Sequence, residues 1–182
     1  MYMMETARLH LRQWREKDMI PFASLNADPR VMEFYPALLK KEESDAMVQR
    51  LYKSITENGW GLWAVEKKDD RDFIGYVGLS RPSFDAHFTP CVEVGWRLKY
   101  EVWGRGFAPE AGRECLRFGF QELILPEIVS FTAKINTRSI RVMEKLGMEH
   151  SEEDDFEHPK VDKSSPLLHH VLYRAKFTDY EY

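Results

Sequence analysis

Alternating and run-like hydrophobic patterns predict the strands of this chain. Apolar and polar residues alternate over residues 6–12, which predicts a strand with one buried face. Runs of aromatic and β-branched residues predict strands at 60–66 and 72–80, joined as a hairpin by the polar turn 68–71. Further strands are predicted at residues 91–99, 128–134, 148–156 and 167–177, the last two forming a final hairpin.

Helical spacing of apolar residues predicts the elements between these strands. The predicted helices cover residues 16–28, 42–58 and 108–122, and a last one begins at Asn136. Gly59 and Gly147 follow the second and the last of these helices, where a left-handed C-terminal cap is expected. Strands and helices therefore alternate along most of the chain.

Composition limits the chain to one domain and excludes several classes of protein. Its 182 residues, 43% of them hydrophobic, predict one domain over residues 1–182. A net charge of −4 gives no sign of a nucleic-acid partner, and no apolar stretch predicts a signal peptide or a membrane span. We therefore expect a cytoplasmic protein. Cys91 and Cys115 lack the spacing of a disulfide framework or a thiolate metal site.

A glycine turn between a strand and a helix gives the first chemical signal. Gly104 and Gly106 follow the strand at 91–99, and Pro109 stands in the first turn of the next helix. Glycines let backbone N–H groups approach an anion, and Arg105 adds a charge. A dinucleotide fingerprint would need a third glycine where Pro109 stands, and a P-loop would need Gly-Lys-Ser/Thr. The turn alone leaves two readings open, an anion site and a plain structural turn.

Several ordered segments together indicate a family. They are Thr6-Ala7-Arg8-Leu9-His10-Leu11-Arg12, Asp28-Pro29-Arg30-Val31-Met32, Val94-Gly95-Trp96-Arg97-Leu98, Trp103-Gly104-Arg105-Gly106-Phe107-Ala108-Pro109-Glu110-Ala111, Asn136-Thr137-Arg138-Ser139, Glu144-Lys145-Leu146-Gly147-Met148 and His170-Val171-Leu172-Tyr173. In these segments the chain resembles the GNAT acetyltransferase superfamily, and within it the RimJ/RimL-like branch of ribosomal-protein N-terminal acetyltransferases. The resemblance covers nearly the whole chain.

The resemblance implies a fold and a cosubstrate. The implied fold is mixed α/β of the α+β type: a central, mostly antiparallel twisted sheet of about seven strands with about four helices, split by a V-shaped gap. Acetyl-CoA is the implied cosubstrate, with no metal. Its pantetheine arm would lie along Trp96, Arg97 and Leu98 as an added strand. The residues implied for its phosphates are Trp103, Gly104, Arg105, Gly106, Phe107 and Ala108, and those beside the sulfur are Asn136 and Ser139.

The resemblance also implies catalytic roles. Glu93 matches the strand position of the family's frequent general base, and the alternative is a structural carboxylate paired with Arg97. The tyrosine that often serves as general acid is replaced here by Met143, and Ser139 is the matching residue for stabilising the thiolate. The alternative for Ser139 is a local helix cap. A backbone amide near Leu98 is expected to stabilise the oxyanion.

The acceptor is expected to be a primary amine, on a peptide N-terminus or on a small molecule. Phe34 and Tyr35, in an irregular segment before Pro36, are the candidates for contact with it. Acidic residues between 149 and 157 are expected to form a solvated face rather than an acceptor site. A non-catalytic module that binds or senses acetyl-CoA is the alternative function. The sequence leaves the oligomeric state open, a homodimer included.

Overall fold

The computed structural model describes residues 2–179, and within them nine strands form one sheet. The strands are β1 (Tyr2–Glu5), β2 (Leu9–Arg12), β3 (Leu62–Lys67), β4 (Phe73–Ser80), β5 (Glu93–Leu98), β6 (Glu127–Ala133), β7 (Glu149–His150), β8 (Phe156–Glu157) and β9 (His169–Lys176). The helices are α1 (Met19–Asn26), α2 (Lys41–Asn58), α3 (Phe107–Gln121) and α4 (Thr137–Lys145).

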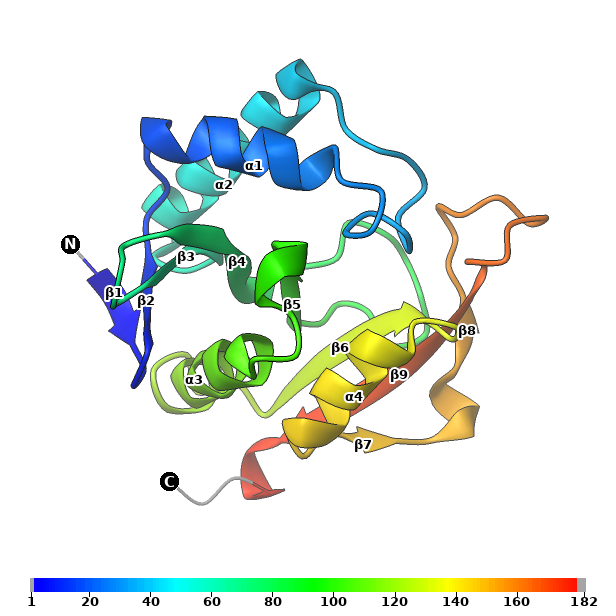
Figure 1. Ribbon diagram of the computed structural model, residues 1–182. Coiled ribbons are helices and arrows are strands. Elements are labelled where there is room, and N and C mark those ends of the chain that lie inside the picture. The colour runs from blue at the N-terminus through cyan, green and yellow to red at the C-terminus, as the bar shows by residue number, and fades with distance from the viewer. Residues whose placement is uncertain (1, 180–182) are drawn as a thin grey trace.

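The sheet follows the order β1-β2-β3-β4-β5-β6-β9-β7, and β8 also pairs with β9. Every pairing is antiparallel except that of β5 with β6. Helices α1 and α2 cover one face of the β2–β4 part, and α3 and α4 lie on the opposite side (Figure 1). The β5–β6 junction therefore lies in the middle of the molecule.

The predicted fold class is confirmed, and the strand count differs for a local reason. Residues 6–8 turn between β1 and β2, where Thr6 Oγ1 accepts the backbone N–H of Leu9 at 3.0 Å. Residues 148–156 do not form one strand, because a short 3₁₀ helix separates β7 from β8. Asp154 in that helix accepts two hydrogen bonds from Arg174 on β9, which holds the segment outside the strand ladder.

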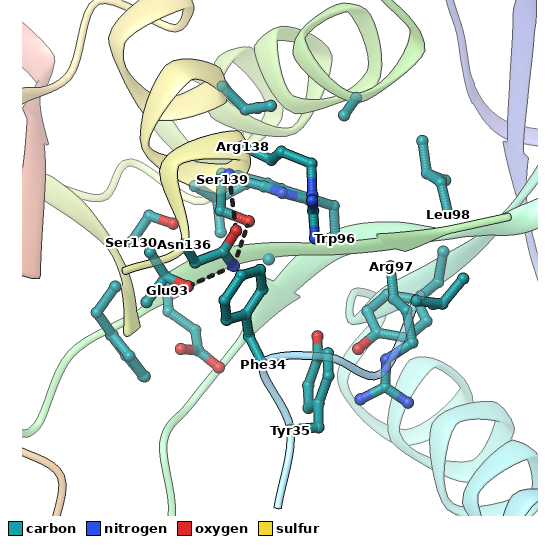
Figure 2. Close-up of a pocket in the computed structure, with 18 of the residues that line it drawn as sticks. Phe34, Tyr35, Glu93, Trp96, Arg97, Leu98, Ser130, Asn136, Arg138 and Ser139 are labelled. Carbon is teal, nitrogen blue, oxygen red and sulfur yellow. Dashed lines mark hydrogen bonds between the residues drawn. The ribbon is translucent and has the colours of Figure 1, made fainter. Parts of the chain in front are cut away.

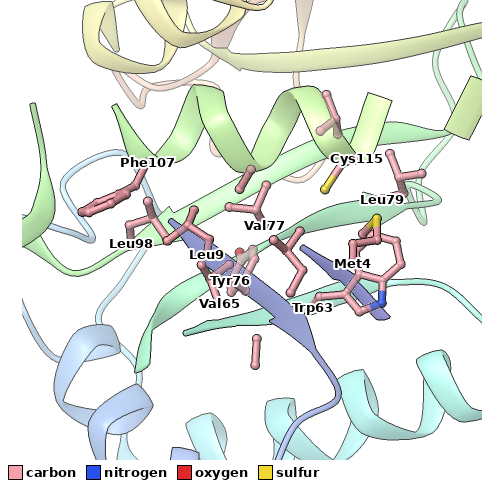
Figure 3. Packing of buried hydrophobic residues seen from close by; sticks show 14 of the residues in the cluster. Met4, Leu9, Trp63, Val65, Tyr76, Val77, Leu79, Leu98, Phe107 and Cys115 are labelled. Carbon is pink, nitrogen blue, oxygen red and sulfur yellow. The ribbon is translucent and has the colours of Figure 1, made fainter. Parts of the chain in front are cut away.

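The hydrophobic core extends over both faces of the sheet, and one part of it lies between the sheet and α3. Val77 and Leu79 of β4 pack with Leu98, Phe107 and Cys115 in one cluster, as Figure 3 shows. Gly119 of α3 lies against this surface, and a Cβ there would approach Ile128 Cδ1 to 2.5 Å. Close packing along α3 therefore fixes its N-terminal end beside the C-terminal end of β5.

The predicted helix ends are also confirmed. Gly59 and Gly147 have left-handed backbone, with φ of 77° and 74°, directly after α2 and shortly after α4. Asn136 is the N-cap of α4, and its side chain accepts the backbone N–H of Ser139. Among the described residues, no helix has the length and apolar character needed to cross a membrane.

Candidate functional site

Strands β5 and β6 separate soon after they meet. Their one register pair is Glu93 with Val129, and the Val129 N–H donates to the Val92 carbonyl at 2.9 Å. Strand β6 instead pairs with β9 along seven residue positions. A cavity of about 780 Å³ opens in the gap, lined by residues of β5, β6, the α1–α2 loop and the first turns of α3 and α4.

The separation leaves one edge of β5 facing this cavity. The backbone groups of Glu93, Gly95 and Arg97 face β4, because these residues form the closely bonded antiparallel pairs. The backbone groups of Val94, Trp96 and Leu98 consequently face the gap. The indole N–H of Trp103 donates to the Leu98 carbonyl at 2.9 Å. An extended ligand could pair with the edge formed by Val94 and Trp96.

The first turn of α3 presents backbone N–H groups at one end of the cavity. Gly104 and Gly106 have φ of 74° and 80°, a conformation in which glycine is favoured. Gly106 is the N-cap and has no side chain to cap the helix, so the N–H groups of Phe107 and Ala108 stay available. Such a helix start is suited to binding an anion, as the sequence predicts.

All the predicted site residues except Arg105 line the cavity. The Arg105 guanidinium instead lies 5.1 Å from the centre of the Phe107 ring, and its carbonyl accepts a hydrogen bond from Arg8. Arg8 itself forms an ion pair with Glu110 and lies 4.4 Å from the Phe107 ring centre. Two cations therefore flank the start of α3 from outside the cavity.

Three cations on α4 line the cavity and were missed in the sequence. Arg138, Arg141 and Lys145 are spaced three and four residues apart, which places them on one helix face. Arg138 lies 4.8 Å from the Trp103 ring centre and 5.2 Å from that of Phe34, and it forms an ion pair with Glu33. Their spacing is a signal that sequence reasoning could have used.

A small hydrogen-bond network holds the Ser139 hydroxyl at the start of α4. The Asn136 amide donates to Ser139 Oγ at 3.1 Å and to Thr132 Oγ1 at 2.9 Å (Figure 2). The helix cap is formed by Asn136 Oδ1, which accepts the Ser139 N–H at 3.2 Å. Because Ser139 Oγ accepts from Asn136, its own proton remains available to donate into the cavity.

Glu93 carries the one carboxyl group among the described residues that line the cavity. Burial raises the pKa of the Glu93 carboxyl to about 7, although Ser80 donates a hydrogen bond to it at 2.7 Å. The structure does not pair Glu93 with Arg97. Arg97 instead donates to Asn26 Oδ1 at 2.6 Å and stacks on Tyr35. A carboxyl group that changes charge near neutral pH is suited to moving a proton.

The hydrogen bond from Ser80 sets part of this pKa, and removing it gives a testable result. In Ser80→Ala the Glu93 carboxylate loses the donor that stabilises its charged form, so its pKa should rise above about 7. Carboxyl ¹³C chemical shifts followed against pH would measure the change. A pKa unchanged from that of the wild type would mean that the Ser80 hydroxyl does not stabilise the charge. Ser80 was not identified in the sequence.

Phe34 and Tyr35 enclose the cavity from the α1–α2 loop (Figure 2). Trp63, on β3, is fully buried in the core and does not line the cavity. His158, Lys160 and His170 line the opposite wall, and sequence reasoning did not place them there. The acidic residues between 149 and 157 lie outside the cavity, and two of them, Asp154 and Asp155, are held in ion pairs.

Comparisons of the sequence and of the fold with known proteins point to one family. A family model described as an acetyltransferase (GNAT) domain matches residues 8–149. The uncharacterized protein YkkB of Bacillus subtilis is 33% identical over 149 residues, covering 80% of this chain and 84% of that protein. A GNAT-family acetyltransferase from Bacillus anthracis has a TM-score of 0.81 at 23% identity, covering 98% of this chain and 99% of that chain.

A further similar structure was solved with a ligand. It is RimL, a ribosomal L7/L12 α-N-protein acetyltransferase in complex with coenzyme A. Its TM-score is 0.75 at 12% identity, and the match covers 97% of this chain and 98% of RimL. The similarity at this identity concerns the fold.

Proposed function

The chain belongs to the GNAT acetyltransferase family and is an acetyltransferase, and from that premise we propose that it transfers the acetyl group of acetyl-CoA directly to a primary amine. The observation that carries the proposal is the separation of β5 from β6 beside the uncapped start of α3. Because of this separation, one cavity is lined by an exposed strand edge, by the backbone N–H groups at the start of α3 and by the Glu93 carboxyl group.

The cavity has groups suited to each part of acetyl-CoA. The amide-bearing pantetheine arm would pair with the β5 edge at Val94 and Trp96. The phosphates would lie on the N–H groups of Phe107 and Ala108, with Arg138, Arg141 and Lys145 supplying positive charge from α4. This places the thioester between the start of α4 and the Glu93 carboxyl.

The chemistry then follows from the groups at that position. A neutral amine attacks the thioester carbonyl, and the Glu93 carboxylate accepts the proton that the amine nitrogen loses, directly or through a water. A backbone N–H on the edge of β5 that faces the gap stabilises the oxyanion. As the new C–N bond forms and the C–S bond breaks, the Ser139 hydroxyl donates a hydrogen bond to the departing thiolate. The products are an N-acetylated amine and coenzyme A.

Direct transfer is favoured over an acetylated cysteine. Cys91 and Cys115 lie outside the cavity lining. Burial raises the pKa of the Cys91 thiol to about 11 and that of Cys115 well above its ordinary value. Because the thiolate is the nucleophilic form, neither residue is suited to accept the acetyl group.

The role of Ser139 is tested by Ser139→Ala. The change removes one hydrogen bond to the leaving thiolate, so kcat should fall by roughly 10-fold, in proportion to about 1–1.5 kcal/mol for such a bond. The helix cap through Asn136 Oδ1 remains, so the melting temperature should change little. Steady-state kinetics and thermal unfolding measure the two effects. Unchanged kcat together with lower stability would assign the hydroxyl a structural role.

Thiol release tests the proposed function against the alternative of a binding or sensing module. Free coenzyme A is measured with acetyl-CoA alone and with acetyl-CoA plus a panel of peptides, amino acids, monoamines and polyamines. Release that depends on an added amine is the expected result. Tight binding of acetyl-CoA without release for any amine would support the sensing module instead.

A further inference from the structure

The charges that line the cavity are unequally divided. Among the described residues, five lysines and arginines contribute to the lining and only Glu93 contributes a carboxyl group. Three of the cations lie on α4: Arg141 and Lys145 are proposed to face the phosphates, and Arg138 lies between Trp103 and Phe34, where Glu33 forms an ion pair with it. The other two, Arg97 and Lys160, remain without such a role. This inference rests on the proposed function and concerns the acceptor that the same site would take.

Arg97 places a buried positive charge behind one wall of the acceptor region. Its exposed fraction is 8%, and its guanidinium lies 4.0 Å from the centre of the Tyr35 ring and 5.5 Å from that of Tyr76. Its hydrogen-bond partner Asn26 is neutral, and no described carboxylate forms an ion pair with it. Arg97 Nε is buried without a hydrogen-bond partner. The charge is therefore not neutralised by the protein.

Lys160, which is exposed like Lys163, places a second positive charge at the cavity lining. Its ammonium donates to Ser83 Oγ at 2.8 Å, three residues after the serine that binds Glu93. The ring centre of His158, two residues before Lys160, lies 4.6 Å from that of Phe84, which is in the same loop as Ser83. Residues 158–160 consequently lie along the loop that follows β4, on the Glu93 side of the cavity.

The space between these charges is largely apolar. Phe34, Tyr35, Pro36 and Leu62 line it, and Gly95 lies between Glu93 and Arg97 on β5 with open space where a side chain would project. A single carboxyl group can receive one amine. A second ammonium on the same acceptor would meet two cations and, among the described lining residues, no second carboxylate.

We propose that the acceptor is a monoamine: one primary amine on an apolar body that carries no second positive charge. Glu93 would receive the amine, and Phe34 and Tyr35 would cover the apolar body. The cations Arg97 and Lys160 would weaken the binding of polyamines and aminoglycosides. A neutral or anionic group is accepted at the end of the body away from the amine.

Three amines that share a benzene ring test this assignment. Benzylamine, 4-(aminomethyl)benzylamine and 4-(aminomethyl)benzoate differ only in the group opposite the reacting amine, which is neutral, cationic or anionic. Calorimetry measures their binding to the protein with coenzyme A present. The dication should bind at least about 10-fold more weakly than the other two, a difference of about 1.4 kcal/mol. Binding of the dication as tight as that of benzylamine, or no binding of any of the three, would overturn the proposal.

A charge reversal on the loop provides the matched comparison. In Lys160→Glu the dication should gain affinity relative to benzylamine, whereas Lys163→Glu, an exposed position of the same loop outside the cavity lining, should leave the ratio unchanged. An equal effect of both variants would contradict a local role for Lys160. Acetyl transfer to the same amines is measured separately. If no amine is acetylated but the dication still binds most weakly, the proposed function is contradicted and the proposed acceptor class is supported.

Discussion

Replacing Glu93 by glutamine is expected to lower kcat/KM for the amine by roughly 10²–10⁴-fold, the usual contribution of a general base. Glutamine has nearly the same size and can still accept the hydrogen bond from Ser80, so the loss reports the missing proton acceptor. In the wild type, kcat/KM should rise with pH through about 7 as the carboxyl ionises. This rise of kcat/KM with pH should be absent in Glu93→Gln. Steady-state kinetics measured across pH gives both the size of the loss and the pH profile.

Glu93→Gln should lower activity but make the folded protein more stable above neutral pH. The folded protein raises the Glu93 pKa from 4.5 to about 7, so folding is favoured by the protonated form and loses stability as pH rises through that interval. Above pH 7 the loss amounts to as much as about 3 kcal/mol, by the relation between pKa and free energy. Glu93→Gln should therefore be more stable than the wild type at pH 8 and similar to it near pH 4.5. Chemical denaturation at the two pH values measures this.

These two readouts separate a base from a structural carboxylate. A variant with the wild-type pH–rate profile would show that another group accepts the proton. A variant less stable than the wild type at pH 8 would show that the ionised carboxylate stabilises the fold, contrary to the burial that raises its pKa. The first result would remove Glu93 from the proposed mechanism, and the second would show that burial does not destabilise its charged form.

The second large effect is expected at the start of α3. Ala108 lies in the first turn, lines the cavity and is only partly buried. In Ala108→Glu a carboxylate would occupy the anion site, so acetyl-CoA should bind about 10- to 100-fold more weakly, since like charges at such a site cost on the order of 1–3 kcal/mol. Helix stability should not suffer, because acidic residues are favourable in a first turn. Calorimetric titration with acetyl-CoA measures the affinity.

Ala108→Gln is the matched control for size. It adds nearly the same side-chain volume without charge, so the difference between the two variants isolates the electrostatic part. Weaker binding of acetyl-CoA by Ala108→Glu, together with nearly unchanged binding by Ala108→Gln, would support phosphate binding at this turn. Equal weakening by both would indicate that the new side chain merely blocks the cavity, and unchanged affinity in both would place the phosphates elsewhere.

Much of this site was predictable because local sequence determines the parts that matter. Gly104 and Gly106 require left-handed backbone, and Asn136 is a favoured cap residue, so both helix starts could be predicted. The alternation along β5 correctly separated the Glu93 face from the Val94 face. The strand at 148–156 was predicted wrongly, since an ion pair with Arg174 on β9 interrupts it.

Other features depend on which strands become neighbours, and no local pattern shows that. Ser80 binds Glu93 because β4 and β5 pair in a register that places the two residues opposite each other. Arg97 turns toward Asn26 on α1, far away in the sequence, and so does not pair with Glu93. Lys160 reaches the cavity only because the β8–β9 loop packs beside the loop after β4. Such contacts follow from tertiary packing.

The most direct test of acetyl transfer is mass spectrometry of both protein and amine after incubation with acetyl-CoA. With an amine acceptor present, the account predicts an N-acetylated amine in an amount equal to the coenzyme A released. Without the amine, the protein itself should carry no acetyl group. An acetylated protein formed in the absence of amine, or bound acetyl-CoA that acetylates no amine, would contradict direct transfer at this site.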